Sequence, residues 1–248
     1  AAPGAVELGR GPAVDEDALT DIDDPKSIIS EAYMTVRTNL SFSTDHGVPK
    51  TLALTSTSPS EGKSTSAYAL ARVLARSSGS VVLVDVDMRR PVVASRLGLD
   101  NSKGISNYLA GDDDWESLVQ AIGGSNVSFV AAGPTPPSAS ELLSGDRLEL
   151  FVRKLSEKFD HVILDSPPML GLSDAALIAK AVEGVIYVIE ADRTAVRASQ
   201  AALSRLRESR AHILGALLTK YRAKQSGYGY GYGYGYGYGK DNPAEKAA

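Results

Sequence analysis

Six short apolar runs, separated by stretches with helical periodicity, restrict the fold of this chain more than any other feature. Strands that are buried on both faces of a sheet need nearly continuous apolar sequence, and intervening helices supply right-handed crossovers between parallel strands. The pattern therefore predicts a doubly wound α/β fold with a mainly parallel sheet flanked by helices. We expect strands at 51–55, 81–84, 127–131, 162–164, 185–189 and 213–218, and helices at about 26–43, 63–77, 140–158, 173–182 and 194–209.

The two ends of the chain differ in composition from this central part. Residues 1–23 are rich in Ala, Gly, Pro and acidic side chains without periodicity, which is typical of an arm or linker. From Gly227 to Gly239 glycine alternates with tyrosine, a pattern that leaves one face of a strand without side chains and cannot form a packed core. We expect a flexible N-terminal arm (1–23), one folded domain (24–222) that has loops and short helices over 99–139, and a flexible tail (223–248).

Composition argues against several kinds of function and partner. The net charge of −4 is unlike that of a strongly basic nucleic-acid-binding surface, so we expect no nucleic-acid partner. The chain has no cysteine, and its three histidines show no metal-site spacing. Because no apolar run of roughly 18 residues occurs, we expect a cytoplasmic chain whose link to a membrane comes through a partner or a missing segment.

A phosphate-binding loop is predicted where the first strand of the folded domain leads into a helix. The sequence there is TSPSEGKST, residues 57–65, with Thr57 in place of the first glycine of the usual motif. In such a loop, backbone N–H groups face the phosphates, Lys63 reaches the β and γ oxygens, and the Ser64 hydroxyl ligates Mg²⁺. The position between strand and helix favours a nucleotide site over a chance match. The residues predicted to bind the nucleotide are Ser58, Pro59, Ser60, Glu61, Gly62, Lys63, Ser64 and Thr65.

Three carboxylates follow predicted strands directly. Asp85 and Asp87 come after the run at 81–84, and Asp165 follows the run at 162–164. Ligands of open parallel sheets bind at the carboxyl ends of the strands, so these side chains and the phosphate loop are expected at one edge. Mg²⁺ is usually held by one or two carboxylates together with water and phosphate oxygens. Phosphoryl transfer further needs an acceptor for the proton of the nucleophile, which one Asp can provide.

These motifs resemble those of a known family. TSPSEGKST, the apolar run into DVDMRRP and the apolar run into DSPP look like the Walker A, Walker A′ and Walker B motifs of the bacterial tyrosine autokinases, or BY-kinases. These are P-loop kinases of capsule and exopolysaccharide synthesis. The resemblance covers residues 26–240 and includes a tyrosine-rich C-terminus, which in that family is the autophosphorylation substrate.

The resemblance implies ATP and Mg²⁺ as cofactors and assigns a role to each site residue. Lys63 and Thr65 would contact phosphates, and Asp85 would accept the proton of the incoming tyrosine. Ser64, Asp87 and Asp165 would hold the magnesium ion. The catalytic set is thus Lys63, Asp85, Asp87 and Asp165, and the phosphoacceptors are Tyr228, Tyr230, Tyr232, Tyr234, Tyr236 and Tyr238.

The same resemblance predicts partners. Residues 31–40 are similar to the oligomerisation helix of the family, with Glu31 and Arg37 matching its motif and Met34 replacing its first arginine. We expect a homo-oligomer that phosphorylates its tail in trans and so regulates polysaccharide polymerisation or export. Further expected partners are a membrane activator of the chain-length-regulator type or an upstream fused domain, and a cognate tyrosine phosphatase. The chain would then work at the cytoplasmic face of the inner membrane.

Two other functions fit parts of the sequence. An ATPase switch similar to the ParA and MinD ATPases of partition and cell division has this fold, but it requires a second lysine where this chain has Ser58. A nucleotide-binding scaffold with an adhesive Gly/Tyr tail is the other.

Thr219 stands where relatives often place an asparagine near the adenine. The simpler expectation for His161 and Trp115 is packing, and for Arg205, Arg207 and Arg210 a solvated helix face.

Overall fold

The computed structural model describes residues 6–12, 18–170 and 173–221. Its strands are β1 (Val6–Pro12), β2 (Thr51–Ser56), β3 (Val81–Asp85), β4 (Val119–Ala121), β5 (Val127–Val130), β6 (His161–Asp165), β7 (Gly184–Glu190) and β8 (Ile213–Tyr221). Its α-helices are α1 (Ala18–Asp23), α2 (Ile28–Leu40), α3 (Lys63–Ser78), α4 (Val93–Leu97), α5 (Ile105–Leu109), α6 (Ala139–Leu143), α7 (Arg147–Lys158), α8 (Asp174–Ile178) and α9 (Val196–Glu208). Two short 3₁₀ turns, Glu116–Leu118 and Ala179–Ala181, complete the described elements.

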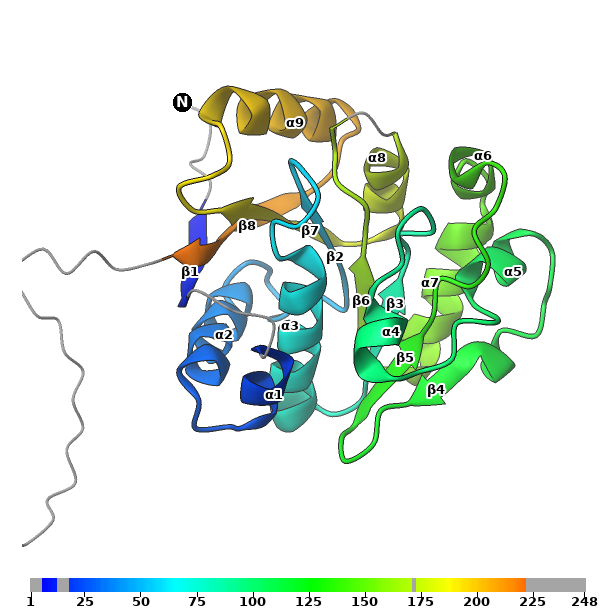
Figure 1. The fold of residues 1–248 in the computed structure, drawn as a ribbon, viewed down its shortest axis with the longest axis horizontal. Helices are drawn as coiled ribbons and strands as arrows, with labels where there is room; N and C mark the ends of the chain where they lie inside the picture. The colour runs from blue at the N-terminus through cyan, green and yellow to red at the C-terminus, as the bar shows by residue number, and fades with distance from the viewer. Residues whose placement is uncertain (1–5, 13–17, 171–172, 222–248) are drawn as a thin grey trace, which may run out of the picture.

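The strands form one sheet in the order β1-β8-β7-β2-β6-β3-β5-β4 (Figure 1). All of its neighbouring strands run parallel except β4, which pairs antiparallel with β5 at the edge. The carboxyl ends of β2, β3 and β6 therefore lie together at one edge of the sheet. The predicted doubly wound, mainly parallel fold is confirmed.

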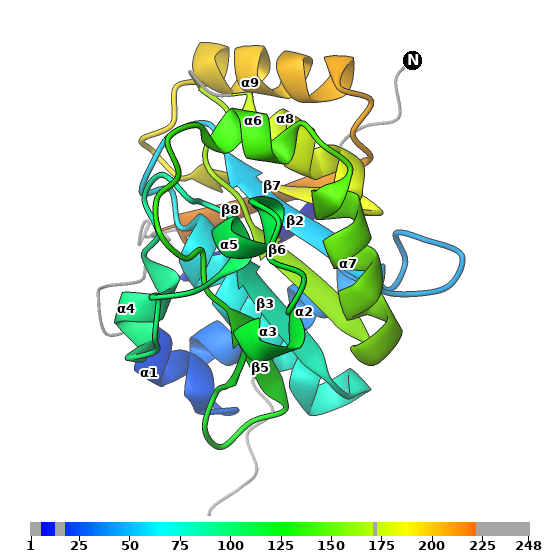
Figure 2. The same cartoon turned by 90° about the vertical axis from the view of Figure 1, so that its right-hand side faces the viewer.

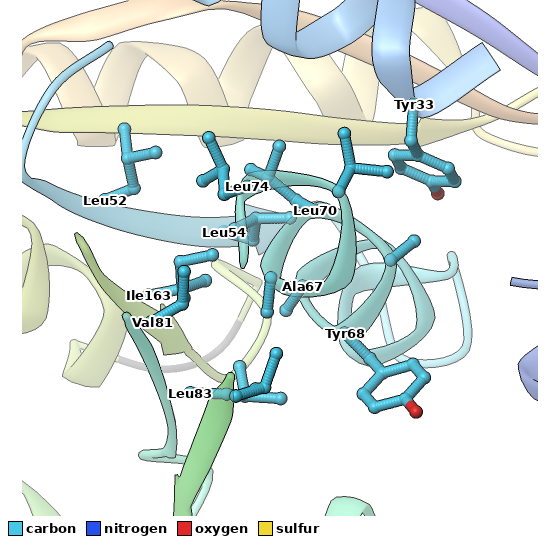
Figure 3. Packing of buried hydrophobic residues seen from close by; sticks show 14 of the residues in the cluster. Tyr33, Leu52, Leu54, Ala67, Tyr68, Leu70, Leu74, Val81, Leu83 and Ile163 are labelled. Atoms are coloured by element: carbon cyan, nitrogen blue, oxygen red, sulfur yellow. The ribbon is translucent and has the colours of Figure 1, made fainter. Parts of the chain in front are cut away.

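Helices cover each face of the sheet (Figures 1 and 2), and each face has its own hydrophobic core. Alternate residues of one strand point to opposite faces, so Leu83 belongs to the core that contains residues of α1 to α4, and Val82 belongs to the core that contains residues of α5 to α9. In the first core, Leu52 and Leu54 of β2 lie beside Leu70 of α3 (Figure 3). Both faces of the central strands are thus buried, which explains why their sequences are apolar without alternation.

The structure differs from the prediction between β3 and β6. The helix expected over 140–158 is two helices, α6 and α7, separated by Ser144, Gly145 and Asp146. These three residues favour turns, because glycine costs backbone entropy in a helix and Ser and Asp side chains compete for backbone hydrogen bonds. The short strand β4 was also not predicted, since three partly exposed residues carry too little pattern to distinguish a strand from a loop.

The segment 1–23, predicted to be a flexible arm, contains two ordered elements. Strand β1 pairs in parallel with β8, and helix α1 follows it. Ile22 at the end of α1 is fully buried, and Asp23 pairs with Arg72 of α3 at 2.7 Å. The strand is held by backbone hydrogen bonds to β8, and a composition-based prediction does not register such bonds.

Candidate active site

The phosphate loop joins β2 to α3 with the backbone geometry that such loops require. Gly62 is the N-cap of α3 and has φ = 94°, a conformation that side chains other than glycine rarely adopt. The Ser66 N–H donates to the Gly62 carbonyl at 2.9 Å, which starts the helix. Lys63, the first residue of α3, is buried. A positively charged side chain therefore lies at the N-terminus of a 16-residue helix, and both favour an anion.

Thr57, which replaces the first glycine of the motif, has a structural reason. Its buried hydroxyl lies 2.7 Å from the Tyr187 hydroxyl on β7 and 3.3 Å from the Ser199 hydroxyl on α9. Burial raises the pKa of Tyr187 to about 12, so this phenol stays protonated and able to donate. The start of the loop is thus fixed to β7 and α9 by a side chain that glycine does not have.

The middle of the loop is held from two sides. Ser60 has φ = 66°, and its carbonyl accepts a hydrogen bond from Lys220 Nζ at 2.8 Å. Glu61 is buried, and its carboxylate accepts from the Ser58 N–H at 3.1 Å and from the Thr194 hydroxyl at 2.7 Å. The loop conformation is therefore set by neighbouring strands and loops as well as by its own sequence.

Thr219, which stands where relatives often place an asparagine near the adenine, contacts the phosphate loop. Its hydroxyl donates to the Glu61 carbonyl at 2.6 Å, and its side chain lies 3.2 Å from the position that a Cβ on Gly62 would take. A side chain at position 62 would thus require Thr219 at the end of β8 to shift. Together, Thr219 and Lys220 fasten the end of β8 to the phosphate loop.

Asp85 and Asp165 are brought together by the sheet. They are directly paired residues at the ends of the neighbouring parallel strands β3 and β6. Asp85 is fully buried, and its two oxygens accept the N–H groups of Asp87 at 3.1 Å and Val93 at 3.3 Å. Burial raises the pKa of Asp85 well above its usual value, and the charge of Asp165 adds to this rise against the two backbone hydrogen bonds.

Asp87 lies on the loop after β3 and is more accessible than Asp85 at the end of that strand. Its Oδ1 accepts the Arg90 N–H at 3.1 Å. Burial raises its pKa above the usual value, while the Arg90 N–H and the charge of Lys63 oppose that rise. The predicted convergence of Lys63, Asp85, Asp87 and Asp165 at one sheet edge is therefore observed.

The donor set fits a magnesium ion bound together with a nucleotide. Burial raises the pKa of Asp165 to about 6, although Lys63 and a hydrogen bond from the Ser64 side chain lower it. Its Oδ1 is buried and accepts no hydrogen bond from the part of the chain that the structure describes. Within that part, no group of three or more acidic or histidine side chains is arranged to hold a metal ion alone. Phosphate oxygens and water would have to complete the coordination shell.

The predicted oligomerisation residues lie on α2. Glu31 and Met34 are exposed, whereas Arg37 is half-buried and its Nε has no hydrogen-bond partner among the described residues. On the buried face of α2 the Tyr33 hydroxyl donates to Ser66 of α3 at 2.8 Å. Sequence reasoning missed this link because it had placed Tyr33 only on an apolar helix face.

Other positions behave as the simpler expectations predict. His161 is buried with Nδ1 3.1 Å from the Pro49 carbonyl, and Arg205, Arg207 and Arg210 are exposed. The six candidate phosphoacceptor tyrosines lie outside the described residues. In the described ranges, no helix is long and apolar enough to cross a lipid bilayer.

Comparisons with known proteins agree with the geometry of the site. Residues 50–214 match the family model described as an AAA domain. The chain is 33% identical to tyrosine-protein kinase YwqD of Bacillus subtilis (strain 168) over 225 residues, which are 90% of this chain and 94% of that protein. The chain belongs to the bacterial tyrosine kinases. The kinase activity predicted from the sequence is thereby confirmed at the level of the family.

A longer relative shows which part of such a tyrosine kinase the chain spans. It is 32% identical to tyrosine-protein kinase etk of Escherichia coli (strain K12) over 197 residues, which are 79% of this chain and 27% of that protein. The structure of the kinase domain of E. coli ETK covers 93% of this chain and 96% of its own, with a TM-score of 0.82 and 28% identity. The chain thus spans about a quarter of the length of etk and nearly all of its kinase domain.

The septum site-determining protein MinD from Pyrococcus horikoshii OT3, complexed with Mg-ADP, is a more distant neighbour. It is 22% identical, has a TM-score of 0.58, and covers 68% of this tyrosine kinase and 69% of its own chain. This likeness establishes a shared fold and nothing more about the ATPase switch considered above.

Proposed function

We propose that this tyrosine kinase transfers the γ-phosphoryl group of ATP to the tyrosines of its own C-terminus, Tyr228, Tyr230, Tyr232, Tyr234, Tyr236 and Tyr238. The observation that carries the proposal is the contact of β8 with the phosphate loop. Thr219 and Lys220 bond to the carbonyls of Glu61 and Ser60 only a few residues before the tyrosine tract begins. The last strand before the tyrosine tract therefore ends beside the phosphate loop.

Each part of the loop edge has a role in this proposal. The backbone of residues 58–65 and the Lys63 ammonium group bind the phosphates of ATP. Ser64, Asp87 and Asp165 hold Mg²⁺, which neutralises charge on the phosphates when it is bound. The unpartnered Oδ1 of Asp165 and the raised pKa values of Asp87 and Asp165 support this assignment, because a nearby cation stabilises the ionised forms.

In the reaction, the tyrosine oxygen forms a bond to the γ-phosphorus. The bond between that phosphorus and the β–γ bridging oxygen breaks, and ADP leaves with the electron pair. Asp85 accepts the phenolic proton, as the resemblance to the family implies.

Asp87 is the alternative proton acceptor, and substitution separates the two. Replacing the true acceptor by Asn should lower kcat by about 10²–10⁴-fold, the usual contribution of general acid–base catalysis, with ADP affinity in Mg²⁺ retained. We expect Asp85→Asn to behave in this way, and Asp87→Asn to weaken the affinity for MgADP. The reverse pattern would transfer the role to Asp87.

We propose that transfer occurs in trans between copies of the chain. The 17 residues from Tyr221 to Tyr238 span at most about 56–61 Å, enough to reach a neighbouring copy. Glu31 and Arg37 on α2 provide the subunit contact, as the resemblance implies. Each phosphate adds a charge of about −1.5 to −2, so repulsion between phosphorylated tails would loosen the assembly.

Intact-mass analysis after incubation with MgATP tests the transfer. We expect mass increases in whole multiples of a phosphoryl group, and peptide mapping should place them at residues 228–238. Mixing a Lys63→Met chain that keeps its tail with an active chain that lacks residues 223–248 then tests the route. Phosphate on the inactive chain is the expected result, and its absence would reject transfer in trans.

For the cell, we propose that the kinase acts at the cytoplasmic face of the inner membrane in polysaccharide polymerisation or export. A membrane activator or fused upstream domain would stimulate it, and a tyrosine phosphatase would reset it. The support is the family match, which includes the putative tyrosine-protein kinase CapB of Staphylococcus aureus at 31% identity. Replacing all six tail tyrosines by Phe in the producing cell should change the length or amount of the polymer; an unchanged polymer would reject this role.

A further inference from the structure

An ion pair next to the metal-facing carboxylate has no role in the function proposed so far. Arg89 lies two residues after Asp87 and reaches across to α8, where its Nε is 2.6 Å from Asp174 Oδ2 and its Nη2 is 3.2 Å from Asp174 Oδ1. This is a two-pronged contact, which fixes the direction of a guanidinium group as well as its distance.

Ser140 of α6 closes the contact into a triangle. Its hydroxyl donates to Asp174 Oδ1 at 2.6 Å and accepts from Arg89 Nη2 at 3.0 Å. Asp174 is buried and Arg89 is half-exposed. Burial alone would raise the pKa of Asp174, but hydrogen bonds from Arg89 and Ser140 outweigh it and lower that pKa. An ion pair and a serine hydroxyl therefore connect three parts of the fold, which are the loop after β3, α6 and α8.

This contact is joined to the turn that carries Asp87. The Arg90 N–H, one residue further along the same turn, donates to Asp87 Oδ1, so the turn and the carboxylate move together. Asp87 and Asp174 are also close enough for their charges to repel, and Arg89 is attracted to both. Without Arg89, the turn would lose this attachment to α6 and α8, and the charge of Asp174 near Asp87 would no longer be compensated by Arg89.

We propose that Arg89, Asp174 and Ser140 form a brace that positions Asp87 for magnesium bound with the nucleotide, which makes Arg89 a positioning residue. The proposal rests on the proposed role of Asp87 as a magnesium ligand. Groups that orient a metal ligand typically change metal affinity by roughly 10–100-fold when they are removed.

The test is the affinity for a fluorescent ADP analogue, titrated with Mg²⁺ and repeated in EDTA. In Arg89→Gln, we expect the Mg²⁺ concentration that strengthens nucleotide binding to rise by about tenfold or more, with unchanged affinity in EDTA. Arg89→Lys, which keeps the charge and loses the second prong, should recover part of the effect. Arg90→Gln is the matched control, because it removes the same charge from an exposed neighbour while the Arg90 N–H remains, and it should behave as wild type.

Ser140→Ala is the second variant and keeps the ion pair. We expect a smaller shift in the same direction, of a few-fold, and this variant decides the question if Arg89→Gln does not fold. A lower melting temperature with an unchanged Mg²⁺ requirement in the folded variants would overturn the proposal and leave the brace a purely structural contact. The readout needs no phosphoryl transfer, so failure of tail phosphorylation in the wild type would reject the proposed function and not the brace.

Discussion

At the scale of single residues, the nucleotide site contains carboxylates that are costly to ionise before ligands arrive. Asp165 is the clearest case, because it is completely enclosed, one of its oxygens has no hydrogen-bond partner in the described chain, and its pKa is raised to about 6. A carboxyl group whose pKa is higher in the folded than in the unfolded state favours folding most when it is protonated. The contribution of Asp165 to the free energy of unfolding should therefore fall as the pH rises from about 4 through 6.

Replacing Asp165 by Asn should remove this cost. Without nucleotide and in EDTA, we expect Asp165→Asn to be more stable than wild type by about 1–3 kcal/mol above pH 6, with the difference vanishing near pH 4. Urea unfolding at several pH values measures it. Asp160→Asn is the control of opposite sign, because hydrogen bonds from Ser80 lower the pKa of Asp160 and its charge stabilises the fold above that pKa. A pH-independent effect of Asp165→Asn would contradict the argument.

The sequence predicted this group of residues well because its geometry follows from strand order. Asp85, Asp87 and Asp165 follow apolar runs, and parallel strands bring their carboxyl ends to one edge. The roles of Thr57 and Thr219 were not predictable in the same way. Each depends on a contact with a residue more than a hundred positions away, and no local pattern records which hydroxyl will meet which partner.

At the scale of elements, α2 is connected to the phosphate-loop helix by one buried hydrogen bond. The Tyr33 hydroxyl donates to Ser66, whose own side chain is fully buried, so neither group has water as a substitute partner. Burial raises the pKa of Tyr33 to about 12, which keeps the donor protonated at all ordinary pH values.

Tyr33→Phe should cost about 1–3 kcal/mol of unfolding free energy, because Ser66 loses its partner while the ring still fills its site. Ser66→Ala should cost a similar amount, and the double variant should cost less than the sum of the two, since both remove one bond. Denaturant unfolding of the four proteins provides the measurement. Strict additivity would show that the two hydroxyl groups do not interact energetically.

Helix positions were easier to predict than helix ends. The apolar spacing of α2, α3 and α9 locates each of them to within a few residues. The interruption between α6 and α7 depends on Gly145 and its two neighbours, and a composition read over a longer window averages such a short signal away. The same limit applies to β4, which is defined by its pairing with β5.

At the scale of the whole molecule, β1 is the edge strand of the sheet and lies next to β8. It covers the open edge of β8, the strand whose end holds that loop. An uncovered strand edge presents unpaired N–H and C=O groups and promotes association with other chains.

Deleting residues 1–17 should therefore lower the melting temperature and increase self-association, which light scattering detects. Nucleotide affinity should also fall, because the end of β8 would be less firmly held. Deleting only residues 1–5 is the matched control, since it leaves β1 in place and should have no effect. Normal association and affinity after the longer deletion would show that β8 does not need its outer neighbour.

The attachment of β8 to the phosphate loop also limits how far each tyrosine beyond it can reach. Tyr221 is a fixed origin at the end of the sheet, and each tyrosine beyond it has its own maximum distance from that point. Seven residues separate Tyr228 from Tyr221, so Tyr228 reaches at most about 23–25 Å, less than half the reach of Tyr238. If the tail is phosphorylated in trans as proposed, Tyr228 cannot enter an active site farther from Tyr221 than this, and only later tyrosines can. Under that proposal, the set of phosphorylated tyrosines would report how far the active site of the neighbouring copy lies from Tyr221.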